Sequence, residues 1–243
     1  MDHGRHEKGR DEFHHLAFLM ARGRLIVLEG AEGAGKTTQM RRLTEQLEQS
    51  GISAVAVREP GGTPVGDAIR EILLDPASQI TATTEALLFM ASRAELTARE
   101  IIPSLEAGKT VLLDRFFLST YAYQVMGRGL AEDDVRAANS IATQGLVPDL
   151  TLLLDVPAGE GLGRADKRGG RDRMEQTGDE FHGRVGEAFR TFCKASWQDS
   201  HPECGPIKLI DGRGDEAEVY QRIVEALAAG FPDPFKALIT LRK

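Results

Sequence analysis

Residues 30–38 combine glycines, a lysine and threonines in an order that can bind phosphate: Gly-Ala-Glu-Gly-Ala-Gly-Lys-Thr-Thr. Gly30, Gly35, Lys36 and Thr37 stand at the required positions of a phosphate-binding loop. In such a loop the backbone N–H groups wrap a polyphosphate, the lysine reaches the outer phosphates and the threonine hydroxyl binds Mg²⁺. The pattern predicts a polyphosphate site formed by Gly30, Ala31, Glu32, Gly33, Ala34, Gly35, Lys36, Thr37 and Thr38.

The segments on either side of this loop have the character that a phosphate site requires. Residues 24–29 form a short apolar run of strand type, and residues 39–49 carry Met40, Leu43 and Leu47 at helical spacing. The loop is therefore expected between a strand and a helix, whose N-terminus adds a partial positive charge. This context argues against a chance glycine-rich turn.

A second charged group, Asp114 and Arg115, follows the apolar run at 110–113. In an open parallel sheet, residues just beyond the carboxyl ends of strands line the ligand crevice. We expect Asp114 to hold Mg²⁺ or its waters and Arg115 to bind a second phosphate. Asp155, which closes the apolar run at 150–154, is the rival acidic candidate. Asp114 is preferred because an arginine accompanies it.

Phe89 and Arg93 suggest a pocket for a planar ring. They are four residues apart, so on a helix they share a face. An aromatic ring beside a guanidinium can stack on a base and bond its carbonyl groups. The alternatives are a core residue for Phe89 and a surface ion pair for Arg93.

A Pro-Gly-Gly turn at 60–62 brings backbone close to a ligand at the carboxyl edge of the sheet.

Short apolar runs separated by helical patterns indicate how these residues are positioned. The runs are apolar at both odd and even positions, which is typical of parallel strands buried on both faces. We expect a doubly wound α/β fold of the phosphate-loop NTPase type, with about five strands in one sheet. The predicted strands are 24–29, 53–57, 110–113, 150–154 and 206–210. The predicted helices are 39–49, 65–74, 83–107, 118–126, 132–144, 178–197 and 215–229.

Residues 159–176 interrupt this alternation with basic side chains among glycines and acids. A solvated linker is one interpretation of such a segment. A mobile lid that closes over phosphates is the other, and the phosphate-binding loop favours it. The basic residues are Arg164, Lys167, Arg168, Arg171 and Arg173.

The length fits one α/β domain or two small ones, and the composition is ordinary for a globular protein. The chain has 243 residues and a net charge of −7, which argues against broad nucleic-acid binding. No apolar run approaches the roughly 20 residues that span a bilayer. Cys193 and Cys204 are the only cysteines, and reduced thiols in a cytoplasmic protein are expected.

Three regions are predicted along the chain. Residues 1–22 read as a flexible extension, since Met20 could itself begin a compact protein, and residues 23–231 are expected to form the domain that carries the phosphate-binding loop and the lid. Residues 232–243 read as a C-terminal tail. The histidines of the extension are expected to be part of a charged tail rather than a metal site. They are His3, His6, His14 and His15.

A phosphate-binding loop alone does not choose between GTPase, ATPase, motor and kinase. The guanine-reading Asn-Lys-x-Asp motif of GTPases is missing from this sequence. Over about residues 24–231 the chain resembles the thymidylate kinase family, most closely its bacterial form. The matching segments are the loop at 30–38, Arg-Glu-Pro-Gly-Gly-Thr at 58–63, Leu-Phe-Met-Ala-Ser-Arg at 88–93, Asp-Arg-Phe-Phe-Leu-Ser-Thr-Tyr-Ala-Tyr-Gln at 114–124, Pro-Asp-Leu-Thr-Leu-Leu-Leu-Asp at 148–155 and Asp-Arg-Met-Glu at 172–175.

The resemblance implies a reaction and its partners. ATP would be the phosphoryl donor, dTMP the acceptor and Mg²⁺ the cofactor, in a homodimer that serves dTTP synthesis in the cytoplasm. Lys36 and Thr37 would bind the ATP phosphates and Mg²⁺. Glu32 would face the 3′-hydroxyl of the acceptor sugar or the metal shell. No nucleic-acid or membrane partner is implied.

The resemblance also assigns the acceptor site. Glu59 and Arg70 would lie at the phosphate end of dTMP, and Arg115 would bind that phosphate. Phe89 would stack on thymine and Tyr123 would crowd the 2′ position of the sugar, favouring deoxyribose. The residues bonding the edge of the base would be Arg93, Thr120 and Gln124.

Two departures and two alternatives accompany the resemblance. Phe116 stands where many relatives have tyrosine, and residues 1–22 have no counterpart expected in the family. The loop has no arginine at 31–34, which resembles the type of family member whose lid arginines do the catalytic work. The catalytic arginines would then come from the lid, with Arg168, Arg171 and Arg173 as candidates. One alternative is another deoxynucleotide or deoxynucleoside kinase of the same fold. The other is a non-catalytic ATP-binding regulator, which would be expected to have a damaged loop or acceptor site.

Overall fold

The computed structural model describes residues 22–156 and 172–240 of the chain. The predicted extension and its histidines therefore lie outside the described residues, except for Arg22 at its end. Most of the predicted lid, including Arg168 and Arg171, lies outside them as well. Within the described residues no helix is long and apolar enough to cross a membrane.

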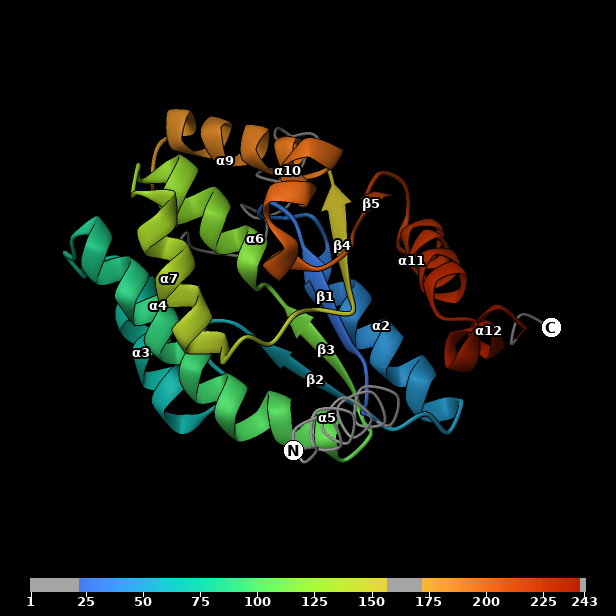
Figure 1. Cartoon of the computed structure of the whole chain (residues 1–243). Coiled ribbons are helices and arrows are strands. Elements are labelled where there is room, and N and C mark those ends of the chain that lie inside the picture. The colour runs from blue at the N-terminus through green and yellow to red at the C-terminus, as the bar shows by residue number, and fades with distance from the viewer. Residues whose placement is uncertain (1–21, 157–171, 241–243) are drawn as a thin grey trace, which may run out of the picture.

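Five parallel strands form a single sheet in the order β2-β3-β1-β4-β5 (Figure 1). Each predicted strand is confirmed, with ends that differ by one residue in most cases. The loop and strand ends singled out in the sequence therefore meet at the carboxyl edge of one sheet. The strands are β1 (Leu25–Glu29), β2 (Ala54–Arg58), β3 (Thr110–Asp114), β4 (Leu150–Asp155) and β5 (Ile207–Asp211).

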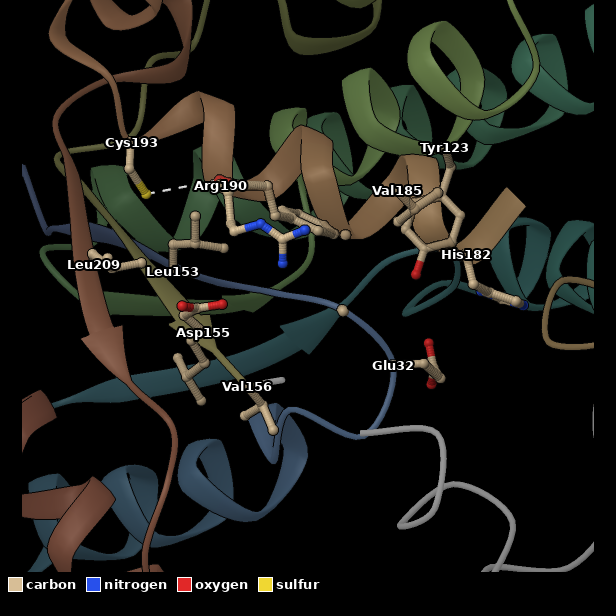
Figure 2. Close-up of a pocket in the computed structure, with 14 residues that line it drawn as sticks. Glu32, Tyr123, Leu153, Asp155, Val156, His182, Val185, Arg190, Cys193 and Leu209 are labelled. Carbon is tan, nitrogen blue, oxygen red and sulfur yellow. Dashed lines mark hydrogen bonds between the residues drawn. The ribbon is translucent and has the colours of Figure 1, made fainter. Parts of the chain in front are cut away.

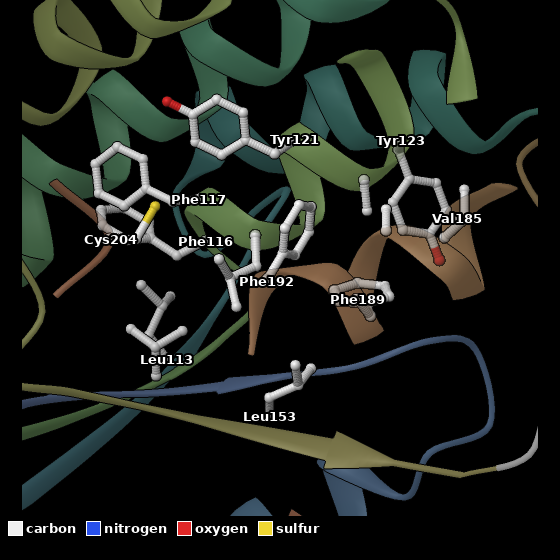
Figure 3. Close-up of a cluster of buried hydrophobic side chains, with 14 of the residues drawn as sticks. Leu113, Phe116, Phe117, Tyr121, Tyr123, Leu153, Val185, Phe189, Phe192 and Cys204 are labelled. Carbon is white, nitrogen blue, oxygen red and sulfur yellow. The ribbon is translucent and has the colours of Figure 1, made fainter. Parts of the chain in front are cut away.

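Helices cover both faces of the sheet, so two hydrophobic cores form (Figure 1). Because side chains alternate along a strand, Leu25 and Val27 point into one core while Ile26 and Leu28 point into the other. The aromatic core on the first face includes Phe116, Phe117, Tyr121, Phe189 and Phe192 (Figure 3).

The helices on the first face begin with α3 (Pro64–Leu74), which packs on α4 (Ala82–Leu96). That face also holds α5 (Ile102–Glu106), α6 (Phe117–Thr120), α7 (Glu132–Thr143), α9 (Asp179–Phe192) and α10 (Ala195–Ser200). The second face holds α2 (Lys36–Gln49), α11 (Glu216–Gly230) and α12 (Pro232–Thr240). A 3-10 turn, η3 (Pro202–Cys204), precedes β5.

The helices predicted at 83–107 and 118–126 each contain a π-helical segment, which the sequence pattern did not predict. A π-helical turn, η1 (Thr97–Ile101), joins α4 to α5, just before Pro103, which has no N–H to bond an earlier carbonyl. A second π-helical segment, η2 (Tyr121–Gly127), follows α6. Single π-helical turns are frequent at functional sites, and η2 carries two of the predicted site residues.

Two further differences concern the C-terminal third of the chain. The helix predicted at 178–197 is divided into α9 and α10 around Cys193 and Lys194. The region predicted as a tail contains α12, whose Phe235 and Leu238 are buried in the second core. Its short apolar pattern follows α11 after a single residue, so the local pattern does not distinguish it from the end of that helix. Both cysteines are free thiols, as expected.

Candidate active site

The phosphate-binding loop connects β1 to α2 with glycine where the backbone demands it. Gly35 caps α2 in the left-handed conformation, at φ 91°. Gly30 has φ 142°, and a Cβ there would lie only 2.5 Å from the carbonyl oxygen of Leu154. A side chain at Gly30 would therefore push the loop away from β4. These constraints explain the glycines that the motif requires.

Lys36, the first residue of α2, folds back over the loop. Its buried ammonium donates hydrogen bonds to the carbonyl oxygens of Gly30 at 2.9 Å and Ala31 at 3.0 Å. Burial, followed by the nearby charge of Arg115, lowers the pKa of Lys36 to about 8. A polyphosphate in the loop would supply the negative charge that this partly desolvated ammonium lacks.

Thr37 and Asp114 come together at the neighbouring ends of the loop and β3. The Thr37 hydroxyl lies 3.2 Å from Asp114 Oδ2, and Asp114 Oδ1 is buried with no hydrogen-bond partner among the described residues. A hydroxyl and an unsatisfied carboxylate oxygen are the hard oxygen ligands that Mg²⁺ prefers. Asp155 instead opens toward a different cavity, described below. The residues present therefore fit a magnesium ion at Thr37 and Asp114.

Arg115 is held in an uncommon backbone conformation, with φ 71°. Its guanidinium donates to Glu32 Oε2 at 2.6 Å and to the Ser119 hydroxyl at 2.9 Å. Glu29, buried at the end of β1, accepts from the Phe116 N–H at 2.7 Å and from the Ser119 N–H at 3.0 Å. These bonds to Glu29 fix the turn, so that Arg115 projects over the phosphate-binding loop.

Two cavities adjoin at this arginine. The larger, about 900 Å³, is lined by the phosphate-binding loop, Asp114 and the start of α11. The smaller, about 100 Å³, lies between α4 and η2. Four side chains line both cavities and so mark the junction between them: Glu32, Glu59, Arg70 and Arg115. Two ligands held in the two cavities would meet end to end at two arginines.

The smaller cavity brings together the residues predicted to bind the acceptor base and sugar. Tyr123 lies there with its ring 5.4 Å from the Arg115 guanidinium, and burial raises the pKa of its hydroxyl to about 12. The phenol is thus neutral at ordinary pH. The predicted base-binding residues that line this cavity are Phe89, Arg93, Thr120 and Gln124.

Arg93 differs from the expectation of a direct bond to the base. It is buried, and every N–H of its guanidinium is directed at a protein oxygen. Glu59 is one partner, and burial raises the pKa of that carboxyl despite the arginine beside it. The remaining partners are Thr120, Asn139 and the Phe116 carbonyl. In this arrangement Arg93 braces the pocket wall and orients Thr120.

A third cavity, of about 210 Å³, lies between the end of β4 and α9 (Figure 2). Asp155 and Arg190 line it together with apolar side chains that include Val185 and Leu209. It meets the other cavities at Glu32. Figure 2 shows the Glu32 carboxylate at one end of this space and Asp155 at the other. Asp155 and Thr37 thus line different cavities.

Of the three arginines predicted to act from the lid, only Arg173 lies within the described residues. Its guanidinium pairs with Glu85 Oε2 at 2.8 Å and donates to the Leu73 carbonyl at 2.7 Å. In this structure Arg173 is therefore tied to α4 and α3 and does not line the phosphate cavity.

Three residues that hold site residues in place were not singled out in the sequence: Glu29, Glu85 and Ser119. The only available signal was an acidic residue within an otherwise apolar strand, at Glu29.

The fold and the two adjoining cavities define a phosphate-loop kinase for a small acceptor that itself carries phosphate. Comparison with known proteins narrows this class. The family profile described as Thymidylate kinase matches residues 28–198. A thymidylate kinase of Deinococcus radiodurans is 48% identical over 209 residues, which cover 86% of this chain and 98% of that relative. The chain therefore belongs to the thymidylate kinase family.

Two further relatives support the assignment. A thymidylate kinase of Alkalilimnicola ehrlichii is 45% identical over 212 residues, covering 86% of this chain and 94% of the relative. One of Carboxydothermus hydrogenoformans is 40% identical over 202 residues, covering 83% and 95%. The similarity thus extends over nearly the whole length of these relatives.

Proposed function

We propose that this chain transfers the γ-phosphoryl group of ATP to the phosphate of dTMP, giving dTDP and ADP. The observation that carries the proposal is the junction of the two cavities at Arg70 and Arg115. A phosphate-binding loop on one side suits the donor. A small pocket with an aromatic wall on the other suits a pyrimidine nucleotide. The family relatives named thymidylate kinase agree with this pairing.

The acceptor phosphate is itself the nucleophile, so no strong general base is needed. One of its anionic oxygens attacks the γ-phosphorus of ATP while the bond to the leaving ADP oxygen breaks. Arg115 and Arg70 would hold the acceptor phosphate against its natural repulsion from ATP. Lys36 would neutralise charge on the outer phosphates of the donor. Catalysis is then mainly positioning and charge stabilisation.

Mg²⁺ is the cofactor that the donor site suits. Thr37 and Asp114 would hold it, directly or through water, because they offer a hydroxyl and a buried carboxylate oxygen without a partner. When bound, the ion supplies positive charge to the phosphate oxygens. Glu32, paired with Arg115, would orient that arginine or meet the sugar 3′-hydroxyl.

We also propose that Arg168 or Arg171 assists from the lid. An arginine acting on the transferred phosphoryl group contributes on the order of 10³ in turnover, so Arg168→Ala or Arg171→Ala should lose about that factor. A variant with unchanged turnover would eliminate that arginine from the role. Arg173 is the weaker candidate because its guanidinium is occupied by Glu85.

Finally, we propose that the enzyme is a homodimer. Apolar side chains on α3 and α4 that remain exposed in the single chain support this: Val65, Ile72 and Leu87. Light scattering after size-exclusion chromatography would distinguish a mass near 53 kDa from the 26.5 kDa of one chain, roughly twofold apart. The cytoplasmic location expected from the sequence stays a prediction.

The proposed reaction is tested by a coupled assay of ADP release with ATP and Mg²⁺. The acceptors are dTMP, dUMP, UMP, CMP, AMP and thymidine. Strong turnover with dTMP, weaker turnover with dUMP and little with UMP is expected. Turnover with thymidine but not dTMP would show that Arg70 and Arg115 do not bind an acceptor phosphate. ATP binding without acceptor-dependent release would favour a regulator.

A further inference from the structure

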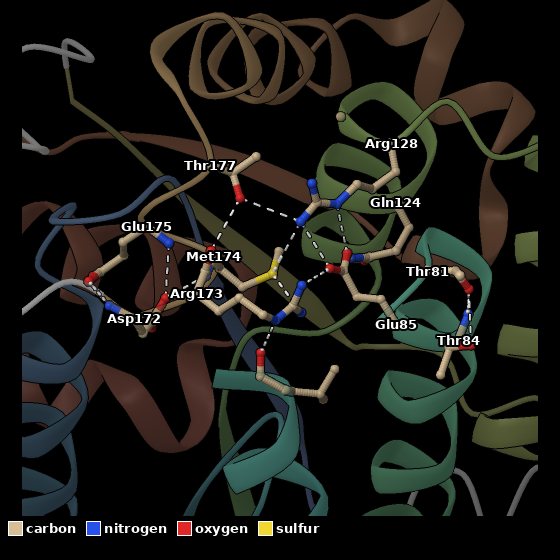
Figure 4. Close-up of polar contacts among 12 residues, drawn as sticks. Thr81, Thr84, Glu85, Gln124, Arg128, Asp172, Arg173, Met174, Glu175 and Thr177 are labelled. Atoms are coloured by element: carbon tan, nitrogen blue, oxygen red, sulfur yellow. Dashed lines mark hydrogen bonds and ion pairs between the residues drawn. The ribbon is translucent and has the colours of Figure 1, made fainter. Parts of the chain in front are cut away.

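Glu85 is a buried carboxylate in the first turn of α4 and contacts Gln124, which lines the smaller cavity (Figure 4). Its side chain is only 1% exposed. Two arginines and one amide surround it: Arg128, Arg173 and Gln124. It does not line any of the three cavities described above. Any effect of Glu85 on a ligand in these cavities must therefore pass through one of these neighbours.

The carboxylate is ionised and can only accept hydrogen bonds. Burial acts to raise the pKa of Glu85, but hydrogen bonds from Arg128 and Gln124 and the charge of Arg128 outweigh burial and lower that pKa. An ionised carboxylate has no proton to donate. Gln124 must consequently turn its amide nitrogen toward Glu85, and this N–H···O bond is 3.0 Å long.

The orientation of the amide decides what the pocket offers to a ligand. Gln124 lines the smaller cavity, and no described residue donates a hydrogen bond to its amide oxygen. The oxygen is thus left as an acceptor for a base. Thr120, by contrast, is left as a donor. Its hydroxyl oxygen accepts a hydrogen bond from Arg93 at 2.9 Å, and its hydroxyl proton has no acceptor among the described residues, so the proton can be donated to a base.

We infer that Glu85 is a positioning residue that sets the hydrogen-bond polarity of the base pocket and so selects a 4-keto pyrimidine over a 4-amino one. Thymine and uracil present a carbonyl oxygen beside an N3–H, which match a donor at Thr120 and an acceptor at Gln124. Cytosine presents an amino group beside an unprotonated N3, and both contacts would be wrong. Unpaired buried polar groups give strong discrimination. The inference rests on the proposed function.

The substitution Glu85→Gln is expected to reverse the orientation of the Gln124 amide. Arg128 and Arg173 are donors only, so they would take the single amide oxygen introduced at position 85. The new amide nitrogen would then face Gln124, whose oxygen would turn toward it. The nitrogen of Gln124 would enter the pocket, which reverses the polarity presented to the base.

The test compares kcat/KM for dTMP and dCMP, at saturating ATP and Mg²⁺, in the full-length protein. Glu85→Gln should lower the dTMP-to-dCMP ratio by about tenfold or more, chiefly through KM of the acceptor, with KM for ATP unchanged. Arg128→Lys is the matched control, since it alters the same ion pair but leaves the Gln124 contact in place. It should keep the ratio. The double variant Glu85→Gln/Gln124→Glu exchanges the two groups and should restore it.

The outcomes separate the inference from the proposed function. If wild-type protein does not phosphorylate dTMP, the proposed function fails. If wild-type protein prefers dTMP but Glu85→Gln keeps the full ratio, the inference fails. It also fails if Arg128→Lys reduces the ratio as much as Glu85→Gln, because a merely structural role would then suffice. Thermal melting monitors folding. If Glu85→Gln does not fold, the dTMP-to-dCMP ratio of the double variant decides: a ratio equal to that of wild type supports the inference, and a lowered ratio contradicts it.

Discussion

The Ser119 hydroxyl donates a 2.6 Å hydrogen bond to Glu29 Oε2 while it accepts one of 2.9 Å from Arg115. A serine within α6 thus connects a buried carboxylate at the end of β1 to the arginine that follows β3. The Glu29 carboxylate and the left-handed backbone of Arg115 place the guanidinium at the junction of the two adjoining cavities.

Removal of this connection should weaken acceptor use. Ser119→Ala is expected to lower kcat/KM for dTMP by about five- to twentyfold, because Arg115 loses one of its anchors, while KM for ATP changes little. Steady-state kinetics with each substrate varied in turn would measure this. Ser200→Ala, at the end of α10 and away from the three cavities, is the control and should behave as wild type. Equal loss for both substrates would contradict a specific role at the acceptor.

The charge of Lys36 predicts how ATP binding varies with pH. The pKa of the ammonium in the free protein is lowered to about 8, and only the protonated form carries the charge that binds phosphate. Affinity should therefore be full below pH 8 and fall as pH rises through that value, by up to about tenfold per pH unit. Titration calorimetry with ATP at successive pH values measures it.

Lys36→Arg supplies the control for this pH dependence. A guanidinium stays charged over the whole range, so any affinity that remains should be nearly independent of pH between about 7 and about 9.5. An affinity of the wild-type protein that is constant or increases over the same range would show that Lys36 does not titrate as proposed.

Much of this architecture could be predicted from local sequence patterns. Runs with apolar residues at both odd and even positions, such as those within Leu25–Glu29 and Leu150–Asp155, indicate a parallel sheet because strands covered on both faces have this composition. The conformation of the phosphate-binding loop could be predicted because Gly30 and Gly35 stand where its backbone requires glycine. Residues near strand ends, such as Asp114, followed from the rule that ligands bind at the carboxyl edge.

The supporting contacts could not be predicted in the same way. Glu85 meets Gln124 across 39 positions and Arg128 across 43, and nothing in the local sequence announces either pair. Arg93 looked like a base-binding residue because its type and spacing allowed it. Only the arrangement of Glu59 and Asn139 around it reveals that its donors are already used.

Tyr123 offers a test of sugar discrimination. Its buried ring lies beside Arg115, where the family resemblance implies the 2′ position of the acceptor sugar. Tyr123→Ala should open this space and raise the kcat/KM ratio of UMP to dUMP by about tenfold, while overall activity falls. Tyr123→Phe keeps the ring and should keep the discrimination against ribose. If the alanine variant also keeps it, another group excludes the 2′-hydroxyl.

Gly127 ends the π-helical segment that carries Tyr123 and Gln124, and it packs directly on α9. A Cβ at Gly127 would lie 2.5 Å from Phe181 Cε2, closer than real Cβ contacts, so the aromatic ring would have to move. Gly127→Ala should therefore lower the free energy of unfolding by about 1–3 kcal/mol. Gly183, on α9 itself, is the matched control, because a Cβ there meets no atom within 4 Å. Gly183→Ala should instead stabilise the helix by about 0.5–1 kcal/mol. Urea unfolding measures both, and an equally stabilised Gly127→Ala variant would show that the contact between η2 and α9 is loose enough to accept a methyl group.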